Sequence, residues 1–487
     1  MLTDALTHLL ATTDFAWSRP APEAPRPTNI QWRADACDDG SILFFQRFDD
    51  GLTDSEIHRR YFAGRHFAAL VTNRPLDCFD RMPGVALHVT RPDDWAEVVR
   101  RFCDVVYPLA PGALRFIGVT GTNGKTTTVK YLESILAAHG RRVLSIGTLG
   151  VFLDGVRQVE TGFTSPPLIE LRRLLYANRE HADVVVMEAS SHALDQGRVA
   201  GIPFQDAGWT NFTQDHLDYH RDEASYFAAK AHLLDLIQPG GRLYCTSRAV
   251  ADRLATRSPT PVPVEVLEPA RLPPEAIAAK PFLALAHNRA NYALAVALAE
   301  RVLGALPDDT TRQHWRHLQP VDGRFDCRVH GNRAIVIDFA HTPDALDTIL
   351  GAIREGFPDA RVVTLFGCGG DRDRSKRSLM GAAVARHSDA IIVTSDNPRH
   401  EPPERIIDDI LTGFPEDQDY SVVVDRAEAI ARLFDQLAAR PDAEPWVALI
   451  AGKGHERYID RDGHKTPYSD QEQVERNLQR LGWTSTS

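Results

Sequence analysis

The stretch Phe116-Ile-Gly-Val-Thr-Gly-Thr-Asn-Gly-Lys-Thr-Thr-Thr128 decides the fold of this 487-residue chain. The apolar run 114–119 predicts a buried parallel strand, and a helical pattern begins at Lys125 after a glycine-rich turn. A strand, a glycine turn and a helix N-terminus form an anion site, because backbone N–H groups and the helix dipole point to one place. Lys125 would reach the outer phosphates of a nucleotide, and the Thr126 hydroxyl would face Mg2+. We therefore predict a nucleoside triphosphate site here.

The motif is a short form of the phosphate loop. The general spacing places a glycine six positions before the lysine, where this chain has Val119, so the match is to Gly-x-x-Gly-Lys-Thr beginning at Gly121. The alternative is a glycine turn with a surface lysine. The strand before the turn and the helix after it disfavour that interpretation.

Length and composition limit the kind of protein. A chain of 487 residues exceeds one hydrophobic core, and we expect about three domains. Its 55 Lys and Arg residues against 66 Asp and Glu residues give a net charge of −11, which disfavours a nucleic-acid partner. No apolar run is long enough to span a bilayer, and residues 1–15 lack the features of a signal peptide. The six cysteines form no C-x-x-C pair, so neither a disulfide framework nor a zinc site is indicated, and we expect a cytoplasmic protein.

Strand-like and helical segments alternate along the chain, which predicts an α/β fold with three domains. We expect a small N-terminal α/β substrate-recognition domain at 1–110, a central nucleotide-binding domain at 111–318 and a second large α/β domain at 319–487. The central sheet should be mostly parallel, with helices on both faces. The expected strands of the two larger domains are 114–119, 143–147, 183–189, 207–211, 242–246, 334–339, 362–366, 390–394, 421–424 and 447–450.

Polar side chains follow several of these strands. Glu188 ends one strand and becomes a candidate Mg2+ ligand beside the phosphate loop, because open α/β sheets bind ligands at the carboxyl ends of their strands. The next strand is followed by a His- and Asp-rich loop that contains His216. Asp338 follows a later strand, where it could hold a ribose hydroxyl or serve as a helix cap. Asn288 could bond a purine edge or cap its helix, and Lys230, in an apolar helix, would by itself be interpreted as a snorkelling lysine.

Three strand ends of the last domain carry a second group of polar residues. These segments are 367–377, 396–401 and 452–456, and they offer Arg, Asn, Asp and Glu side chains beside glycines. Guanidinium groups suit carboxylates, and carboxylates suit ammonium groups. We therefore predict a pocket for a small zwitterion.

The sequence resembles the Mur ligase family, and within it the MurE type, over Ile117–Glu456. That type uses ATP and Mg2+ to join a diamino acid to UDP-N-acetylmuramoyl-L-alanyl-D-glutamate in peptidoglycan synthesis. The family fold has an N-terminal domain that recognises the UDP-sugar, a central ATPase domain and a C-terminal Rossmann-like domain. The motifs that carry the resemblance are Gly121-Thr-Asn-Gly-Lys-Thr-Thr127, Thr164-Ser-Pro166, Glu188-Ala-Ser-Ser-His-Ala-Leu-Asp-Gln-Gly-Arg198, Asp215-His-Leu-Asp218, His287-Asn288 with Asn291, Gly323-Arg-Phe325, Asp338-Phe-Ala-His-Thr-Pro-Asp-Ala345, Gly369-Gly-Asp-Arg-Asp373, Asp396-Asn-Pro-Arg399 and Gly452-Lys-Gly-His-Glu456.

The resemblance also implies roles for single residues. Four would be catalytic: Lys125, Glu188, His216 and Lys230, the last in carbamoylated form. Those that would bind ATP are Gly121, Thr122, Asn123, Gly124, Lys125, Thr126, Thr127, Asn288, Arg324 and Asp338. Mg2+ would be held by Thr126, Glu188, His216 and Lys230. The glutamyl acceptor would contact Thr164, Ser165, Ser191, Gln196 and Arg198. The amino-acid substrate, meso-diaminopimelate, would contact Arg377, Asp396, Asn397, Arg399, Gly452 and Glu456.

The first domain departs from the family pattern. Where the family carries Asp-Ser-Arg, which helps to grip the UDP-sugar, this chain has Arg33-Ala34-Asp35. Two alternatives therefore stay open: a MurE-like ligase of another pathway that uses a UDP-free or carrier-linked glutamyl acceptor, and a non-catalytic scaffold with the same fold. Five polar residues kept around one site disfavour the scaffold. We expect a monomer with small-molecule substrates.

Overall fold

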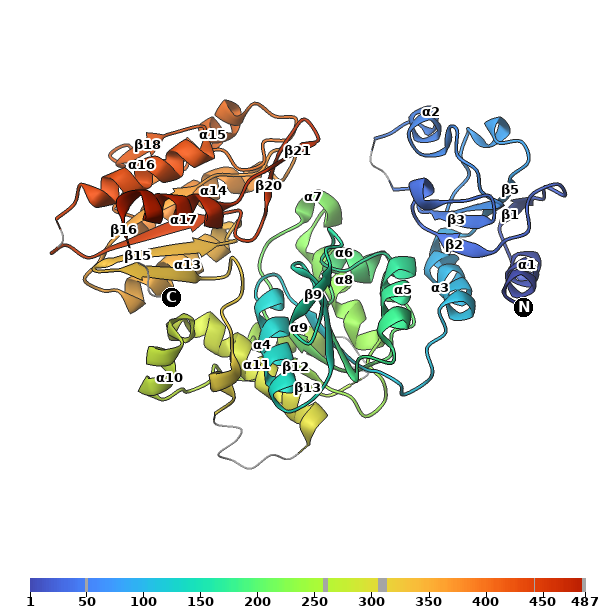
Figure 1. The fold of residues 1–487 in the computed structure, drawn as a ribbon, viewed down its shortest axis with the longest axis horizontal. Helices are drawn as coiled ribbons and strands as arrows, with labels where there is room; N and C mark the ends of the chain where they lie inside the picture. Colours follow the sequence, from blue (N-terminus) through green and yellow to red (C-terminus); the bar gives the residue numbers. More distant parts are fainter. Residues whose placement is uncertain (49–50, 257–261, 305–312, 442, 484–487) are drawn as a thin grey trace.

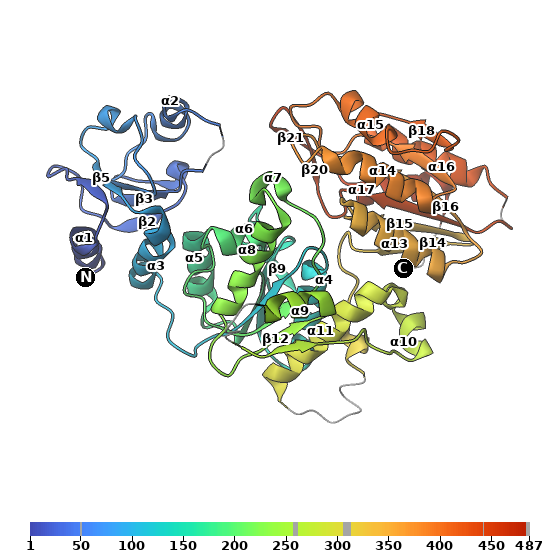
Figure 2. The same ribbon diagram turned by 180° about the vertical axis from the view of Figure 1, so that it is seen from behind.

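The computed structural model describes residues 1–48, 51–256, 262–304, 313–441 and 443–483. Its ribbon has three lobes, each built around its own sheet, and they follow one another from blue to red along the sequence (Figures 1 and 2). The expected three-sheet α/β class is confirmed. The boundaries 1–110, 111–318 and 319–487 stay predictions.

The N-terminal lobe contains a five-stranded sheet in the order β1-β5-β4-β3-β2. Apolar side chains of this sheet and of α3 share one cluster with Leu168 and Ile169 of the central lobe, which links the two lobes. The elements are α1 Leu2–Thr12, β1 Trp17–Arg19, β2 Asn29–Gln31, β3 Ser41–Phe45, α2 Asp54–Ile57, β4 Ala69–Thr72, β5 Ala86–Val89 and α3 Trp95–Val106.

The central lobe has an eight-stranded sheet in the order β13-β12-β11-β6-β10-β7-β8-β9. All neighbours pair in parallel except the β7–β8 and β8–β9 pairs. β6 lies between β10 and β11, so the segments after these three strands share one edge. Its strands are β6 Arg115–Thr120, β7 Val143–Gly147, β8 Gly150–Leu153, β9 Val156–Val159, β10 Val184–Glu188, β11 Phe204–Trp209, β12 Leu243–Cys245 and β13 Val264–Val266. Its helices are α4 Lys125–Ala138, α5 Leu168–Asn178, α6 Ser191–Asp195, α7 Leu217–His220, α8 Glu223–Asp235, α9 Arg248–Ala255, α10 Pro274–Ala279 and α11 Ala286–Leu303.

The C-terminal lobe has a six-stranded sheet in the order β14-β15-β19-β16-β17-β18, in which only the β14–β15 pair is antiparallel. A separate β20–β21 hairpin follows β19. Its strands are β14 Asp326–His330, β15 Arg333–Asp338, β16 Arg361–Phe366, β17 Ala390–Val393, β18 Tyr420–Val422, β19 Trp446–Ala451, β20 Tyr458–Arg461 and β21 His464–Pro467. Its helices are α13 Pro343–Gly356, α14 Ser375–His387, α15 Pro403–Leu411, α16 Arg426–Ala438 and α17 Asp470–Leu481.

The expected parallel strands of both larger lobes are present within a few residues of their predicted bounds. The remaining strands of these two lobes were not predicted from the sequence: β8, β9, β13, β14, β20 and β21. All six cysteines are free thiols. Among the described residues, none of the helices combines the length and the apolar character needed to cross a bilayer.

Candidate active site

The phosphate loop joins β6 to α4, and two of its glycines are required by their surroundings. Gly121 has φ +136°, and a Cβ there would lie 1.9 Å from the Thr210 hydroxyl oxygen. Gly124 has φ +83°, and a Cβ there would lie 2.5 Å from Asn291 Oδ1. A side chain at either position would therefore collide with the neighbouring segment as well as strain the backbone. The loop is shaped for close approach of a ligand to its backbone.

Two lysine amines meet at this loop, the half-buried Lys125 and the buried Lys230. Lys125 Nζ donates to the carbonyl oxygens of Gly121 at 2.9 Å and Thr122 at 2.8 Å. Lys230 Nζ donates to the same Gly121 oxygen at 2.7 Å. Burial lowers the pKa of Lys230 well below its usual value, and the nearby Lys125 lowers that pKa further. Lys230 is 1% exposed and points into the phosphate loop, so the snorkelling interpretation is wrong for it.

Glu188, at the end of β10, faces the first turn of α4. Thr126 Oγ1 donates to Glu188 Oε1 at 2.9 Å, and the Thr148 backbone N–H donates to the same oxygen at 2.8 Å. The pair of a threonine hydroxyl and a carboxylate beside a phosphate loop is a donor set that Mg2+ accepts when it arrives with a nucleotide. His216 has φ +53°, and its Nε2 lies 3.4 Å from Asp215 Oδ2. Burial lowers the pKa of His216 to about 3, so the imidazole is neutral at pH 7 and fit to act as a metal ligand.

A cavity of about 90 Å3 lies beside the phosphate loop, between the central and C-terminal lobes. It brings Asn123, Gly124 and Thr127 together with Asn288, Arg324 and Asp338, six of the residues for which an ATP contact stays a prediction. Two backbone N–H groups hold the Asp338 carboxylate, those of Phe325 at 2.8 Å and Ala340 at 2.7 Å. The guanidinium of Arg324 lies over the Phe339 ring, 4.5 Å from its centre. The cavity also contains Asn211 and Asn291, which the sequence analysis did not select as site residues.

A second cavity, of about 150 Å3, lies between the His216 loop and three strand ends of the C-terminal sheet. Five of the six residues predicted for the amino acid line it: Asp396, Asn397, Arg399, Gly452 and Glu456. Gly452 has φ +115°, and a Cβ there would lie 2.7 Å from Asp396 Oδ2. Lys376 and Arg372 line the cavity as well, and the sequence analysis missed them. Their position after the glycines of the segment 367–377 was the available signal.

Arg377 and Arg399 differ in what they contact. Arg377 is 1% exposed and is not among the lining residues; it forms ion pairs with Glu401 at 2.7 Å and Asp409 at 2.8 Å. Arg399 lines the cavity and donates from Nη1 to the Gly370 carbonyl oxygen at 2.6 Å. Within the described ranges Arg399 forms no ion pair with Glu401 or with any other carboxylate. Its charge is therefore available to a ligand, whereas that of Arg377 is used within the fold.

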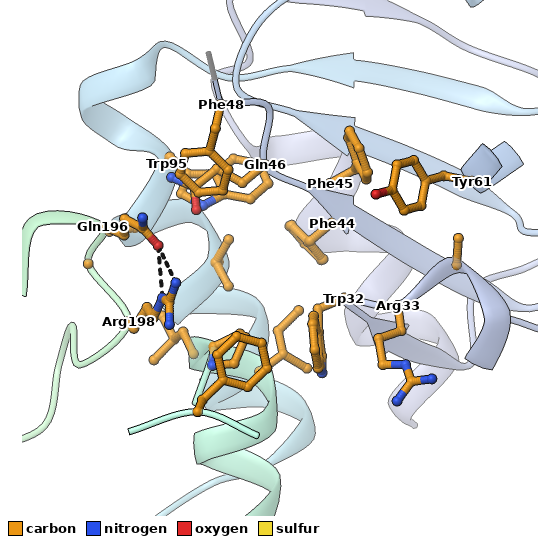
Figure 3. A pocket seen from close by; sticks show the side chains of 18 of the residues that line it. Trp32, Arg33, Phe44, Phe45, Gln46, Phe48, Tyr61, Trp95, Gln196 and Arg198 are labelled. Atoms are coloured by element: carbon orange, nitrogen blue, oxygen red, sulfur yellow. Dashed lines mark hydrogen bonds between the residues drawn. The ribbon is translucent and has the colours of Figure 1, made fainter. Parts of the chain in front are cut away.

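The largest of these three cavities, about 580 Å3, lies between the N-terminal and central lobes (Figure 3). On the central side Arg198 donates from two nitrogens to Gln196 Oε1, at 2.8 and 2.6 Å, and from Nη1 to the Ser165 carbonyl oxygen at 3.1 Å. The Arg33 guanidinium lies at the rim, paired with Asp35. Aromatic rings line much of the rest: Trp32, Phe44, Phe45, Phe48, Tyr61, Trp95 and Phe163. A volume of this size and this lining suit a drug-sized organic ligand.

Hydrogen bonds link several of the predicted acceptor residues to Glu188. Ser165 Oγ donates to the Glu188 backbone oxygen at 2.7 Å, and Thr164 Oγ1 lies 3.0 Å from Thr148 Oγ1. Ser191 is 1% exposed, and its hydroxyl has no partner among the described residues. In the same part of the chain, no three His, Cys, Asp or Glu side chains are grouped so that they could hold a metal ion by themselves.

Two protein-family models match the two larger lobes of the chain. Residues 119–260 match the family model described as "Mur ligase middle domain", and residues 323–454 match "Mur ligase, glutamate ligase domain". The chain belongs to the Mur ligase family. As a Mur ligase it uses ATP to form a C–N bond, and the scaffold alternative is excluded.

Several curated relatives of this Mur ligase carry the name UDP-N-acetylmuramoyl-L-alanyl-D-glutamate–2,6-diaminopimelate ligase. The protein from Alkalilimnicola ehrlichii is 41% identical over 397 residues, which cover 76% of each chain. The protein from Xanthomonas oryzae pv. oryzae is 39% identical over 385 residues, covering 74% of this chain and 76% of that protein. A solved structure of an enzyme with the same name has a TM-score of 0.56 at 24% identity and covers 94% of this chain and 96% of its own, which supports the fold.

Proposed function

We propose that this Mur ligase joins diaminopimelate to the glutamyl carboxylate of UDP-N-acetylmuramoyl-L-alanyl-D-glutamate in peptidoglycan synthesis. The observation that carries the proposal is Arg399, a cation that lines the cavity of about 150 Å3 beside Asp396 and Glu456 without a carboxylate partner in the described chain. Diaminopimelate supplies that partner with its second carboxylate, and lysine does not. Relatives 36–41% identical to the chain bear the corresponding name.

The reaction has two steps. The γ-phosphoryl group of ATP passes to the glutamyl carboxylate, so a C–O–P linkage forms and ADP leaves. The amine of diaminopimelate then attacks the carbonyl carbon, the C–N bond forms, the C–O bond to phosphate breaks, and the departing phosphate or solvent takes the proton. Lys125 and the backbone N–H groups of the phosphate loop would hold the transferring group and offset its charge, which is the main catalytic contribution in phosphoryl transfer.

Magnesium is part of the proposal, and the residues present fit it. The Thr126 hydroxyl and the Glu188 carboxylate are already adjacent, and the imidazole of His216 is neutral. The metal would neutralise phosphate charge when it is bound. Lys230 joins this set only after carbamoylation, because an ammonium group cannot ligate a cation.

We assign the acceptor to the aromatic cavity between the N-terminal and central lobes. Arg198 and Gln196 would contact the peptide part, and the rings of Trp32 and Trp95 would stack on the nucleobase. Since Asp35 already pairs with Arg33, aromatic contact would replace the polar grip that the family obtains from its Asp-Ser-Arg element. We also expect a monomer in the cytoplasm, and both stay predictions.

One observation favours a second candidate. The N-terminal lobe carries the Arg33–Asp35 ion pair where the family grips the UDP-sugar, so a UDP-free glutamyl acceptor is the rival substrate. A panel of UDP-linked and UDP-free glutamyl acceptors, each assayed for ADP release with ATP and diaminopimelate, separates the two. ADP release confined to the UDP-linked acceptor supports the proposal. Equal or faster turnover of the free dipeptide would favour the rival.

A further inference from the structure

Lys453 is a fully buried lysine behind the amino-acid cavity, at the turn after β19. Its Nζ donates to Asn397 Oδ1 at 3.0 Å and to Glu456 Oε2 at 3.0 Å, and lies 4.0 Å from Asp396 Oδ1. These three partners all line the cavity, and Lys453 itself does not. One ammonium group therefore connects polar side chains that follow two different strands, β17 and β19.

The contacts fix how Asn397 and Glu456 are presented. Asn397 Oδ1 also accepts from the Asp460 backbone N–H at 3.0 Å, so two donors determine which end of the amide faces inward. The Asn397 Nδ2 is thereby turned to Glu456 Oε2, to which it donates at 2.7 Å. Glu456 Oε2 then holds two hydrogen bonds, while Oε1 accepts none from the described residues. That free oxygen is the one left for a ligand.

The charges of Lys453 and its neighbours also indicate that this site is left open to a ligand. Of the four carboxylates that line the cavity, those of Asp396 and Glu456 lie close to Lys453, and like charges in a poorly solvated site repel each other. The Lys453 ammonium offsets one of these charges, so the three groups together carry a net charge of −1. That local balance matches a single ammonium group of a substrate, and Arg399, which lines the cavity with Arg372 and Lys376, suits the adjacent carboxylate. The cluster is organised to read one amino-acid head group.

We propose that Lys453 is the positioning residue of the amino-acid site: it holds Asn397 and Glu456 in the orientation that binds the substrate ammonium, without touching the substrate. The inference rests on the proposed function for the identity of that substrate. Lys453 would thus contribute to substrate binding through Asn397 and Glu456. If Lys453 only stabilised the fold, its substitution would change the kinetic constants for all substrates alike.

The test compares steady-state constants of the full-length enzyme and three variants. Lys453→Met and Lys453→Gln should raise KM for diaminopimelate roughly 10- to 100-fold, the size expected for losing hydrogen bonds to a charged group. KM for ATP and for the UDP-linked acceptor should change less than twofold. Lys453→Arg keeps the charge and should recover part of the loss. Arg354→Met is the matched control, because it breaks a C-terminal-lobe ion pair with Asp389 and does not line the cavity.

A double-mutant cycle with Glu456→Gln tests whether Lys453 acts through Glu456. We expect the Lys453→Gln/Glu456→Gln enzyme to have nearly the same KM for diaminopimelate as Glu456→Gln alone. Additive effects, a uniform loss for all three substrates, or failure of all three Lys453 variants to fold would each overturn the proposal and leave a structural lysine. Wild-type turnover with diaminopimelate tests the proposed function separately, since its absence would refute that function whatever the variants do.

Discussion

Lys125 and Lys230 donate hydrogen bonds to the same carbonyl oxygen, that of Gly121. Burial lowers the pKa of both amines, because it disfavours their charged forms, and the nearby Lys125 lowers the pKa of Lys230 further. The phosphates of ATP would draw Lys125 outward and provide the missing anionic charge. Lys230 would stay where it is, hydrogen-bonded to the Gly121 carbonyl oxygen.

The first prediction concerns Lys125. Lys125→Ala should lower acceptor-dependent ADP release by at least 100-fold, because the cation that offsets charge on the transferring phosphoryl group is lost. The buried helix α4 should remain folded, which circular dichroism and thermal unfolding would check. Undiminished ADP release in a folded Lys125→Ala enzyme would refute the phosphate-loop assignment.

The second prediction concerns carbamoylation of Lys230. A neutral amine adds to CO2, with a new N–C bond and loss of one proton, and burial shifts the pKa of Lys230 downward, in the direction of that neutral form. Lys230→Ala should lose most activity and regain part of it with added formate or acetate, whose carboxylate replaces the carbamate. Intact-mass measurement at high bicarbonate offers an independent check. Full activity of the variant without added acid would contradict the prediction.

The third prediction concerns Arg399. Its partner in the described chain is a neutral carbonyl oxygen, so a substrate carboxylate would gain a charge-assisted hydrogen bond worth roughly 1.5–3 kcal/mol. Arg399→Ala should therefore lower kcat/KM for diaminopimelate roughly 10- to 100-fold. The same change should leave the weak activity with lysine nearly unaffected. An equal loss for both amino acids would show that Arg399 supports the fold and does not select the substrate.

At the scale of elements, the site follows from parallel strands whose carboxyl ends share an edge. β6, β10 and β11 bring together the phosphate loop, Glu188 and the segment leading to His216, and β16, β17 and β19 do the same for the amino-acid cavity. The sequence could predict this much, because each strand is a short apolar run followed at once by glycine and polar residues. Because the strands were expected to run parallel, their carboxyl ends were expected to share one edge of each sheet.

Other features were beyond the sequence pattern. Arg377 and Arg399 follow neighbouring strands and both carry a guanidinium group. Arg377 nevertheless forms ion pairs with Glu401 and Asp409, whereas Arg399 lines the cavity. Such a choice depends on how α14 and α15 pack, which local propensity does not encode. The aromatic cavity joins residues about 130 positions apart, such as Trp32 and Phe163, whose rings lie 5.8 Å apart. No local period marks such long-range contacts.

The fourth prediction concerns the approach of β7 to β10. A Cβ at Gly147 would lie 2.2 Å from Glu188 Oε1, so alanine there must displace the carboxylate from Thr126 and Thr148. Gly147→Ala should reduce ADP release at least tenfold and lower the free energy of unfolding by about 1–3 kcal/mol. Gly356→Ala, where no neighbouring atom lies within 4 Å, is the control and should change neither quantity. Normal ADP release by Gly147→Ala would show that the position of Glu188 is not critical.

At the scale of the whole molecule, the three cavities lie where lobes meet. The aromatic cavity contains residues of the N-terminal and central lobes, and the other two contain residues of the central and C-terminal lobes. Asn123 of the phosphate loop donates to Asp344 of α13 at 3.4 Å, a direct link between the nucleotide site and the C-terminal lobe. The acceptor, the nucleotide and the amino acid would thus each bind where two lobes meet.

A competition assay with one enzyme sample tests most directly whether this Mur ligase adds diaminopimelate, and not lysine, to the UDP-linked acceptor. The enzyme receives ATP, magnesium, UDP-N-acetylmuramoyl-L-alanyl-D-glutamate and equal concentrations of diaminopimelate and lysine. The products are then identified and quantified by mass spectrometry. We predict one ADP released per tripeptide formed, and a product that contains diaminopimelate in at least tenfold excess over lysine. Comparable amounts of the lysine product, or ADP release without any UDP-linked tripeptide, would contradict the account.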